Sequence, residues 1–292
     1  MTTDADEQLE RFFNRFRRDA GSILLLDYDG TLAPFRVDRF RATPWAGVRE
    51  LLSRIQLQGR TRIAIVSGRP AGEIGPLLGL DQPLEVWGLH GAERLYPDGR
   101  RELEETPPEA RHRLDELRRR LSIDSLGGRY EDKPNAAVMH WRGCSHDKAK
   151  HVEQRTRRLF EPLALMNGLA LLEFESGIEL RTGRDKGGAV EAILDESDSA
   201  VPVAFLGDDL TDEAGFRAVN NLGSRGLSVL VRREFRETEA DVWLRPPAEL
   251  RKFLEQWLCA AEMQGKGNRD RATEEAYEAE YHDRQLVGSA AR

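Results

Sequence analysis

Runs of apolar residues alternate along the chain with amphipathic segments, which is the pattern of strands and helices in an α/β fold. Residues 23–26 (ILLL) are apolar without alternation, so they predict a strand covered on both faces of a sheet. Further strands are expected within 61–70, 83–93, 201–207 and 226–233, and helices at 6–18, 45–57, 72–80, 185–196 and 248–262. Strands that alternate with helices indicate a Rossmann-like parallel sheet with helices on its faces.

The order of elements changes in the middle of the chain. A helix at 106–122 and two short strands are followed by a second helix at 145–160 and another strand pair. This αββαββ order predicts a separate α+β layer inserted into the sheet domain. We therefore expect an N-terminal helix within 1–19, a core formed by 20–101 and 182–262, an inserted cap at 102–181, and a charged, disordered tail at 263–292.

Composition narrows the class of protein. The 292 residues are 39% hydrophobic and 33% charged, and no apolar run approaches the length of a membrane span. The N-terminus has no signal-peptide core, and two cysteines do not make a disulfide framework, so we expect a cytoplasmic protein. The net charge of −7 argues against nucleic acid as a partner.

Two acids follow the first strand directly, in the stretch LLLDYDGTL. In parallel sheets, ligands bind at the carboxyl ends of the strands, which places Asp27, Ser67 and His90 along one rim. An Asp-Gly pair is also a common hairpin turn. A calcium loop is a further alternative, but it requires glycine at its sixth position, where this chain has Leu32.

A second acidic cluster, GDDLTDE, also follows an apolar run. Asp208, Asp209 and Asp212 repel one another unless a cation or a hydrogen-bond network holds them. The alternative is a solvated helix N-terminus, where Thr211 begins a plausible cap. Together with Asp27 across adjacent strand ends, the cluster favours a metal site, and oxygen ligands of this kind suit Mg²⁺.

Phosphoryl transfer explains this pattern of residues. A carboxylate such as Asp27 can attack phosphorus, provided that positive charge lies nearby, and a metal ion and Lys186 can supply it. Asp29, two residues further, can protonate the leaving alcohol and then activate water. Ser67 and Thr31 can donate hydrogen bonds to phosphate oxygens.

The motifs DYDGT, a serine after a strand, a lysine, and GDDLTDE, in that order, resemble the haloacid dehalogenase superfamily of phosphohydrolases. Within it, the chain resembles the trehalose-6-phosphate phosphatases, through the stretches LDYDGTL, IVSGR, GLHGAE, YEDK, HWR, ELR and GDDLTDE. The resemblance implies a Mg²⁺-dependent hydrolysis of trehalose 6-phosphate through an aspartyl-phosphate.

The resemblance also implies roles for individual residues. Asp27 is the nucleophile and Asp29 the acid and base; Asp27, the main-chain oxygen of Asp29, and Asp208 bind the metal, supported by Asp209 and Asp212. The residues expected to bind the substrate are Thr31, Arg69, His90, Glu131, Lys133, Arg142 and Glu179. A cap that covers the rim would exclude water before the chemical step.

Several alternatives stay open. The family usually carries Gly-Lys shortly before the acid of its last cap strand, whereas this chain has ESGIELRTG without a lysine. A sucrose or glucosylglycerol phosphate is therefore an alternative substrate, and a phosphomutase is a further one. A non-catalytic sugar-phosphate sensor is an alternative of another class. The expected partners are a small sugar phosphate and a separate synthase of the same pathway, with no membrane.

Overall fold

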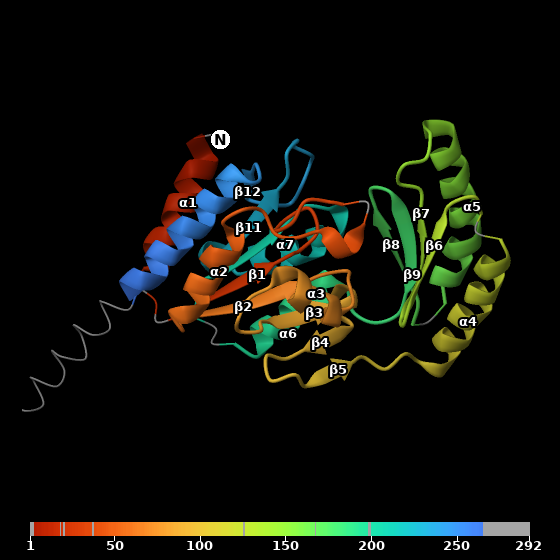
Figure 1. Ribbon diagram of the computed structural model, residues 1–292, viewed down its shortest axis with the longest axis horizontal. Coiled ribbons are helices and arrows are strands. Elements are labelled where there is room, and N and C mark those ends of the chain that lie inside the picture. The colour runs from red at the N-terminus through yellow and green to blue at the C-terminus, as the bar shows by residue number, and fades with distance from the viewer. Residues whose placement is uncertain are drawn as a thin grey trace, which may run out of the picture.

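The computed structural model describes residues 3–264, apart from residues 18, 20, 37, 125, 167, 198 and 199. The molecule consists of a larger sheet domain and a smaller one, which lie next to each other (Figure 1). The larger has eight strands in the order β12-β11-β10-β1-β2-β3-β4-β5, and the smaller has four in the order β6-β7-β9-β8. The predicted α/β class, a parallel core with an α+β cap, is confirmed.

The core sheet is parallel from β12 to β3, and β4 and β5 join its edge in antiparallel register. Its strands are β1 (Ser22–Leu26), β2 (Thr61–Val66), β3 (Glu85–Gly88), β4 (Glu93–Leu95), β5 (Arg101–Leu103), β10 (Val203–Gly207), β11 (Gly226–Val231) and β12 (Val242–Leu244). Its helices are α1 (Thr3–Phe16), α2 (Val48–Leu57), α3 (Ala71–Leu78), α6 (Lys186–Asp195), α7 (Glu213–Asn220) and a C-terminal helix over 248–264.

Helices cover both faces of this sheet, which is why its strands are apolar without alternation. Leu24 and Leu26 of β1 belong to the cluster that includes α1, α2 and α3. Ile23 and Leu25 point to the other face, toward α6 and α7. Because β1 pairs in parallel with β2 and β10, the Asp-Gly pair after it is not a hairpin turn. The strand instead delivers its acids to the rim.

The first and last helices of the described chain, α1 and the C-terminal helix, lie side by side on the side of the core that is far from the cap (Figure 1). Phe13 and Phe16 of α1 pack against Trp257, whose indole lies 4.5 Å from the Phe16 ring, centroid to centroid. The C-terminal helix continues through Gln264, whose side-chain amide donates to the Phe16 carbonyl at 2.7 Å. The helix thus includes residues 263 and 264 of the predicted tail, and the rest of that tail, 265–292, lies outside the described residues.

The cap consists of α4 (Pro108–Ile123), β6 (Arg129–Lys133), β7 (Ala136–His140), α5 (His146–Ala164), β8 (Ala170–Phe174) and β9 (Gly177–Arg181). Its helices lie on the side of the sheet that faces away from the core (Figure 1). Alternate strand residues such as Met139 and Ile178 pack under these helices. The residues between them, including Glu131 and Glu179, therefore face the core. The domain boundaries at 102 and 181 stay predictions.

Candidate active site

The carboxyl ends of the central core strands open into one cavity of about 220 Å³ between core and cap. Asp27 follows β1, Ser67 follows β2, His90 follows β3, and Asp208 follows β10. The predicted residues that line the cavity are Asp27, Asp29, Ser67, Arg69, His90, Glu131, Lys133, Arg142, Glu179, Lys186, Asp208 and Asp209. Thr31 and Asp212, the other two, are buried behind it, hydrogen-bonded to Asp27 and Lys186.

A buried lysine joins two carboxylates at the floor of the cavity. Lys186 begins α6, and its Nζ donates to Oδ1 of Asp27 and to Oδ1 of Asp212, each at 2.6 Å. All three residues are almost fully buried. The Thr31 hydroxyl donates to the second oxygen of Asp27 at 3.1 Å. Asp27 is thus held in one orientation, with its carboxylate at the floor of the cavity, directly after the end of β1.

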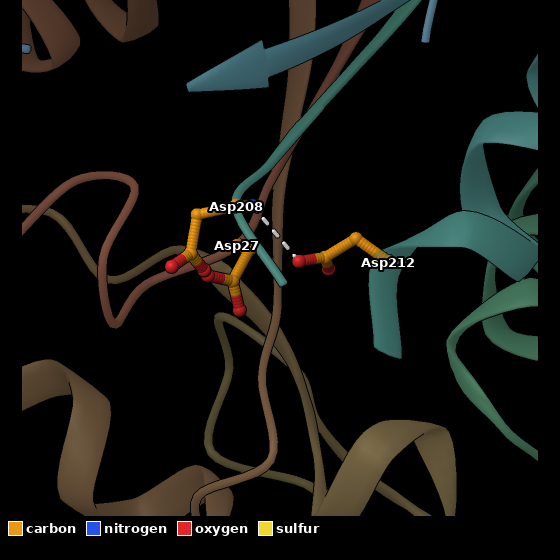
Figure 2. Close-up of side chains that lie close together, drawn as sticks. All are labelled: Asp27, Asp208 and Asp212. Atoms are coloured by element: carbon orange, nitrogen blue, oxygen red, sulfur yellow. Dashed lines mark hydrogen bonds between the residues drawn. The ribbon is translucent and has the colours of Figure 1, made fainter. Parts of the chain in front are cut away.

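Asp208 completes the acidic cluster, and the backbone around it allows the close approach. Gly30 has a φ of +87°, and a Cβ at that position would lie 2.0 Å from Oδ2 of Asp208. Asp27, Asp208 and Asp212 offer oxygen atoms within 4.8 Å of one another. Figure 2 shows Asp208 beside Asp27, while Asp212 points toward the backbone amide of Asp208.

The acidic loop is capped by its own residues. Oδ2 of Asp212 accepts from the amides of Asp208 and Asp209 at 2.9 and 3.0 Å, and the Asp209 side chain caps the short 3₁₀ turn η3 (Leu210–Asp212). Thr211, expected to begin the cap, lies inside this turn instead. Since Lys186 and two amides already bind the oxygens of Asp212, the carboxylates with the most capacity for a further ligand are those of Asp27 and Asp208.

Three buried carboxylates share a single ammonium, so the cluster has excess negative charge. Burial and the nearby Asp212 raise the pKa of Asp27 to about 7, although Lys186 opposes the change. Burial, together with the charges of Asp27 and Asp212, raises the pKa of Asp208 well above its ordinary value. Burial opposes the charge of Lys186, but Asp212 and Asp27 raise its pKa, so Lys186 stays protonated. The oxygen-only donor set therefore fits a bound divalent cation.

This charge excess predicts how stability depends on pH when metal is removed. In EDTA, Asp27 titrates with a pKa of about 7 when folded and near 3.8 when unfolded, so its contribution to stability is lost as pH rises between these values. Asp27→Asn is therefore expected to melt at a higher temperature than wild type at pH 8, with the difference shrinking toward pH 5. Differential scanning calorimetry at both pH values measures it. A difference that is constant, or larger at pH 5, contradicts this assignment.

Asp29 lies beside Asp27 on the same loop and is held by an arginine. Arg69 donates from Nε and Nη2 to the two oxygens of Asp29, at 2.5 and 2.7 Å. Ser67 accepts from the Arg69 amide through Oγ at 3.3 Å, which leaves its own hydroxyl hydrogen available. The core side of the cavity therefore presents a fixed carboxylate and a free donor next to Asp27.

The cap side presents carboxylates and a lysine. Lys133 donates from Nζ to Oε2 of Glu179 at 2.7 Å and to the carbonyl of Gly68, a core residue, at 3.1 Å. In the described part of the chain, Oε1 of the buried Glu179 has no hydrogen-bond partner, although Nε of Arg181 lies 3.4 Å away. Lys133 and Arg181 thus lie next to the two oxygens of the Glu179 carboxylate, on the cap side of the cavity. Burial and nearby cations, Lys133 first among them, lower the pKa of His90, so it is neutral.

Four contacts at or beside the cavity were not expected from the sequence. Arg39, on the short 3₁₀ turn η1 (Arg39–Arg41), donates to Glu131 in the cap and, at 2.6 Å, to Glu73 in α3. His140 bonds the second oxygen of Glu131 at 2.8 Å. His140 stands in the HWR stretch and could have been found there, whereas no sequence signal marks Arg39 or Glu73. Arg142 places its guanidinium over the Phe35 ring, 4.3 Å from its centroid.

A comparison with known families decides the identity of this site. The sequence model of the family described as Trehalose-phosphatase matches residues 25–242, which include every site residue named above. The chain belongs to the trehalose-phosphatase family. It is 29% identical over 243 residues to the trehalose-phosphate phosphatase of Mycolicibacterium paratuberculosis, covering 80% of this chain but 61% of that protein. The chain thus spans less than two thirds of the length of this relative.

Other trehalose-phosphatase relatives are closer in length. The trehalose-6-phosphate phosphatase of Escherichia coli is 28% identical over 247 residues, with 83% of this chain and 89% of that protein covered. Among solved structures, the C-terminal domain of the C. albicans trehalose-6-phosphate phosphatase superposes with a TM-score of 0.73 at 22% identity, covering 87% of this chain and 96% of that one. The likeness to the C. albicans structure supports the two-domain fold described above.

Proposed function

We propose that the chain is a phosphomonoesterase that hydrolyses trehalose 6-phosphate to trehalose and phosphate. The observation that carries this proposal is one cavity with two different ends. At the core end lie Asp27, Lys186 and Asp208, which suit phosphoryl transfer, and at the cap end lie Glu131 and Glu179, which suit sugar hydroxyls. Membership of the trehalose-phosphatase family supports the choice of substrate.

In the proposed reaction, a carboxylate oxygen of Asp27 attacks phosphorus while the bond from phosphorus to the sugar oxygen breaks. Asp29 gives its proton to that sugar oxygen, and trehalose leaves with Asp27 phosphorylated. Asp29, now ionised, takes a proton from water as the water oxygen attacks phosphorus, which releases phosphate and restores Asp27. The ammonium of Lys186, 2.6 Å from Asp27, reduces the repulsion between the Asp27 carboxylate and the substrate phosphate throughout.

The proposed metal is Mg²⁺, held by Asp27, Asp208 and the main-chain oxygen of Asp29. Asp212 and Asp209 hold the loop in place through the amide and cap bonds described above. When bound, Mg²⁺ supplies positive charge to the phosphate and to the attacking carboxylate. The excess of buried carboxylates over ammonium groups supports this assignment.

The remaining core residues are proposed to bind the phosphate. The Ser67 hydroxyl can donate to a phosphate oxygen, since its hydrogen is not used in the bond from the Arg69 amide. Thr31 instead donates to Asp27, so we assign it to orienting the nucleophile. Arg69 is proposed to position Asp29 and to lie near the transferred group.

The cap residues are proposed to bind the sugar. Glu179 lines the cavity, and Lys133 and Arg181 fix its carboxylate, so we assign this carboxylate to a sugar hydroxyl. Glu131 faces the same cavity from β6. Arg142 and the neutral His90 also line it and are proposed to contact the sugar. Because Lys133 also bonds the core carbonyl of Gly68, sugar binding is linked to closure of the cap.

Phosphate release from a panel of sugar phosphates tests this function. With Mg²⁺ present, we expect kcat/KM for trehalose 6-phosphate to exceed that for sucrose 6-phosphate, glucosylglycerol phosphate and glucose 6-phosphate by about 10²-fold or more, because the buried cap carboxylates penalise mismatched hydroxyls. EDTA should abolish release. Preference for another member would keep the chemistry and change the substrate, and no release from any member would favour the sensor alternative.

We also propose a location and a partner for the protein. Among the described residues, no helix combines the length with the apolar character that a membrane crossing requires. Cys144 and Cys259 are both free, which agrees with a reducing, cytoplasmic location. A separate synthase that makes trehalose 6-phosphate is proposed as the source of the substrate.

A further inference from the structure

A continuous series of charged side chains runs beside the cavity, from the core to the cap. It begins at Asp29, which Arg69 binds through both oxygens. Nη1 of Arg69 lies 3.5 Å from Oε2 of Glu73, and the same oxygen accepts from Arg39 at 2.6 Å. Arg39 then donates across the gap to Glu131. The series joins the proposed acid to the proposed sugar subsite.

Arg39 is the member of this series that crosses from core to cap. It lies in the loop after β1, on the turn η1, where Asp38 accepts from the Phe40 amide and fixes the turn. Its side chain is bound between two carboxylates, is 32% exposed and lines the cavity. The Arg39 guanidinium can bind Glu73 of the core and Glu131 of the cap at the same time only when the cap is closed against the core.

The far end of this contact is a carboxylate with a fixed orientation. Glu131 accepts from Arg39 at Oε1 and bonds His140 at Oε2. Burial opposes its charge, but the His140 bond and the charges of Lys133 and Arg39 lower the pKa of Glu131 to about 2. A carboxylate has about four lone-pair sites. Two of these sites are therefore left for hydroxyl donors, and the bonds to Arg39 and His140 fix the plane of the carboxylate in which they lie.

We propose that Arg39 is a positioning residue that completes the sugar subsite from the core side, by orienting Glu131 while the cap is closed. This inference rests on the proposed function, because it takes Glu131 as a ligand of the sugar. The same guanidinium also binds Glu73 of α3 on the core side. Closure of the cap and orientation of Glu131 are then parts of one arrangement, whereas Asp29 is held separately by its two bonds from Arg69.

Steady-state kinetics of Arg39→Met with two substrates test the proposal. Trehalose 6-phosphate needs the sugar subsite, whereas p-nitrophenyl phosphate reaches only the core end. We expect kcat/KM for trehalose 6-phosphate to fall about tenfold, mostly through KM, with less than about twofold change for p-nitrophenyl phosphate. Arg39→Lys, which can reach one carboxylate well, should give an intermediate value.

The matched control is Arg41→Met, an exposed arginine of the same turn that does not line the cavity. It should behave as wild type with both substrates. A cycle with Glu131→Gln adds a readout that a merely structural role would not move: if Arg39 acts through Glu131, the double variant should lose no more than the worse single variant. Losses that multiply, or equal losses with both substrates, would overturn the proposal.

Amide hydrogen exchange keeps the inference separate from the proposed function. Residues 129–133 of β6 should exchange faster in Arg39→Met than in wild type or Arg41→Met, whatever the substrate is. If wild type hydrolyses trehalose 6-phosphate and Arg39→Met matches it in KM and exchange, the Arg39 proposal fails alone. If wild type releases no phosphate, the function fails, and unchanged exchange would then reject the core-to-cap contact as well.

Discussion

Asp27→Asn is expected to lower kcat for trehalose 6-phosphate by at least about 10⁴-fold, because an amide oxygen is a poor nucleophile and no other carboxylate occupies its place. Asparagine has nearly the same shape: Lys186 can still donate to its Oδ1, and its amide nitrogen can donate to the Thr31 hydroxyl, so the fold should persist. Phosphate release under saturating substrate and Mg²⁺ measures the loss, and calorimetry of substrate binding measures what remains.

The matched control is Asp81→Asn, an exposed aspartate away from the cavity, which should retain wild-type activity. Retained binding by Asp27→Asn with no turnover is the result expected for an enzyme. If Asp27→Asn hydrolyses trehalose 6-phosphate within tenfold of wild type, another group is the nucleophile. If wild type itself binds the sugar phosphate without turnover, the protein is a sensor.

Asp29→Asn is expected to separate the two chemical steps. With trehalose 6-phosphate, kcat should fall by about 10²- to 10⁴-fold, since the sugar oxygen needs a proton to leave. With p-nitrophenyl phosphate, the leaving group departs without a proton, so Asp27 is still phosphorylated. The second step lacks its base and becomes slow. Rapid mixing should therefore show a burst of p-nitrophenolate of about one per enzyme, followed by a slow steady rate.

The side-chain oxygen that Asp29→Asn retains can still accept from Arg69, so the loop should keep its shape. Wild type is the reference, and it should show a smaller burst or none, because its second step is fast. Equal losses with both substrates and no burst would place Asp29 in a structural role. If wild type shows a burst and Asp29→Asn does not, Asp29 is needed mainly for phosphorylation of Asp27, and its assignment as the base of the second step is wrong.

Much of the core followed from local signals. Unbroken apolar runs marked β1, β2 and β10 because both faces of this sheet are covered, and parallel strands bring their carboxyl ends to one edge. Boundaries were less predictable. The helix expected from residue 45 begins at Val48, since Trp45 donates its indole N–H to the Thr31 carbonyl and so belongs to the loop.

The site divided in the same way. Asp27, Lys186 and Asp208 stand in motifs whose chemistry is local to a strand end or a helix start. Arg39 and Glu73 have no such motif, because their role depends on two layers meeting across a cavity. The Asp212–Lys186 bond likewise joins residues 26 positions apart through packing of α6 beside η3. Contacts of this kind are properties of the fold and not of any short stretch.

Mass spectrometry of Asp29→Asn, quenched in acid during the p-nitrophenyl phosphate burst, tests the central claim most directly. The account predicts one phosphoryl group per chain, on the side chain of Asp27, and none on Asp27→Asn treated in the same way. A phosphoryl group on another residue, or a burst from a chain that carries none, would contradict it.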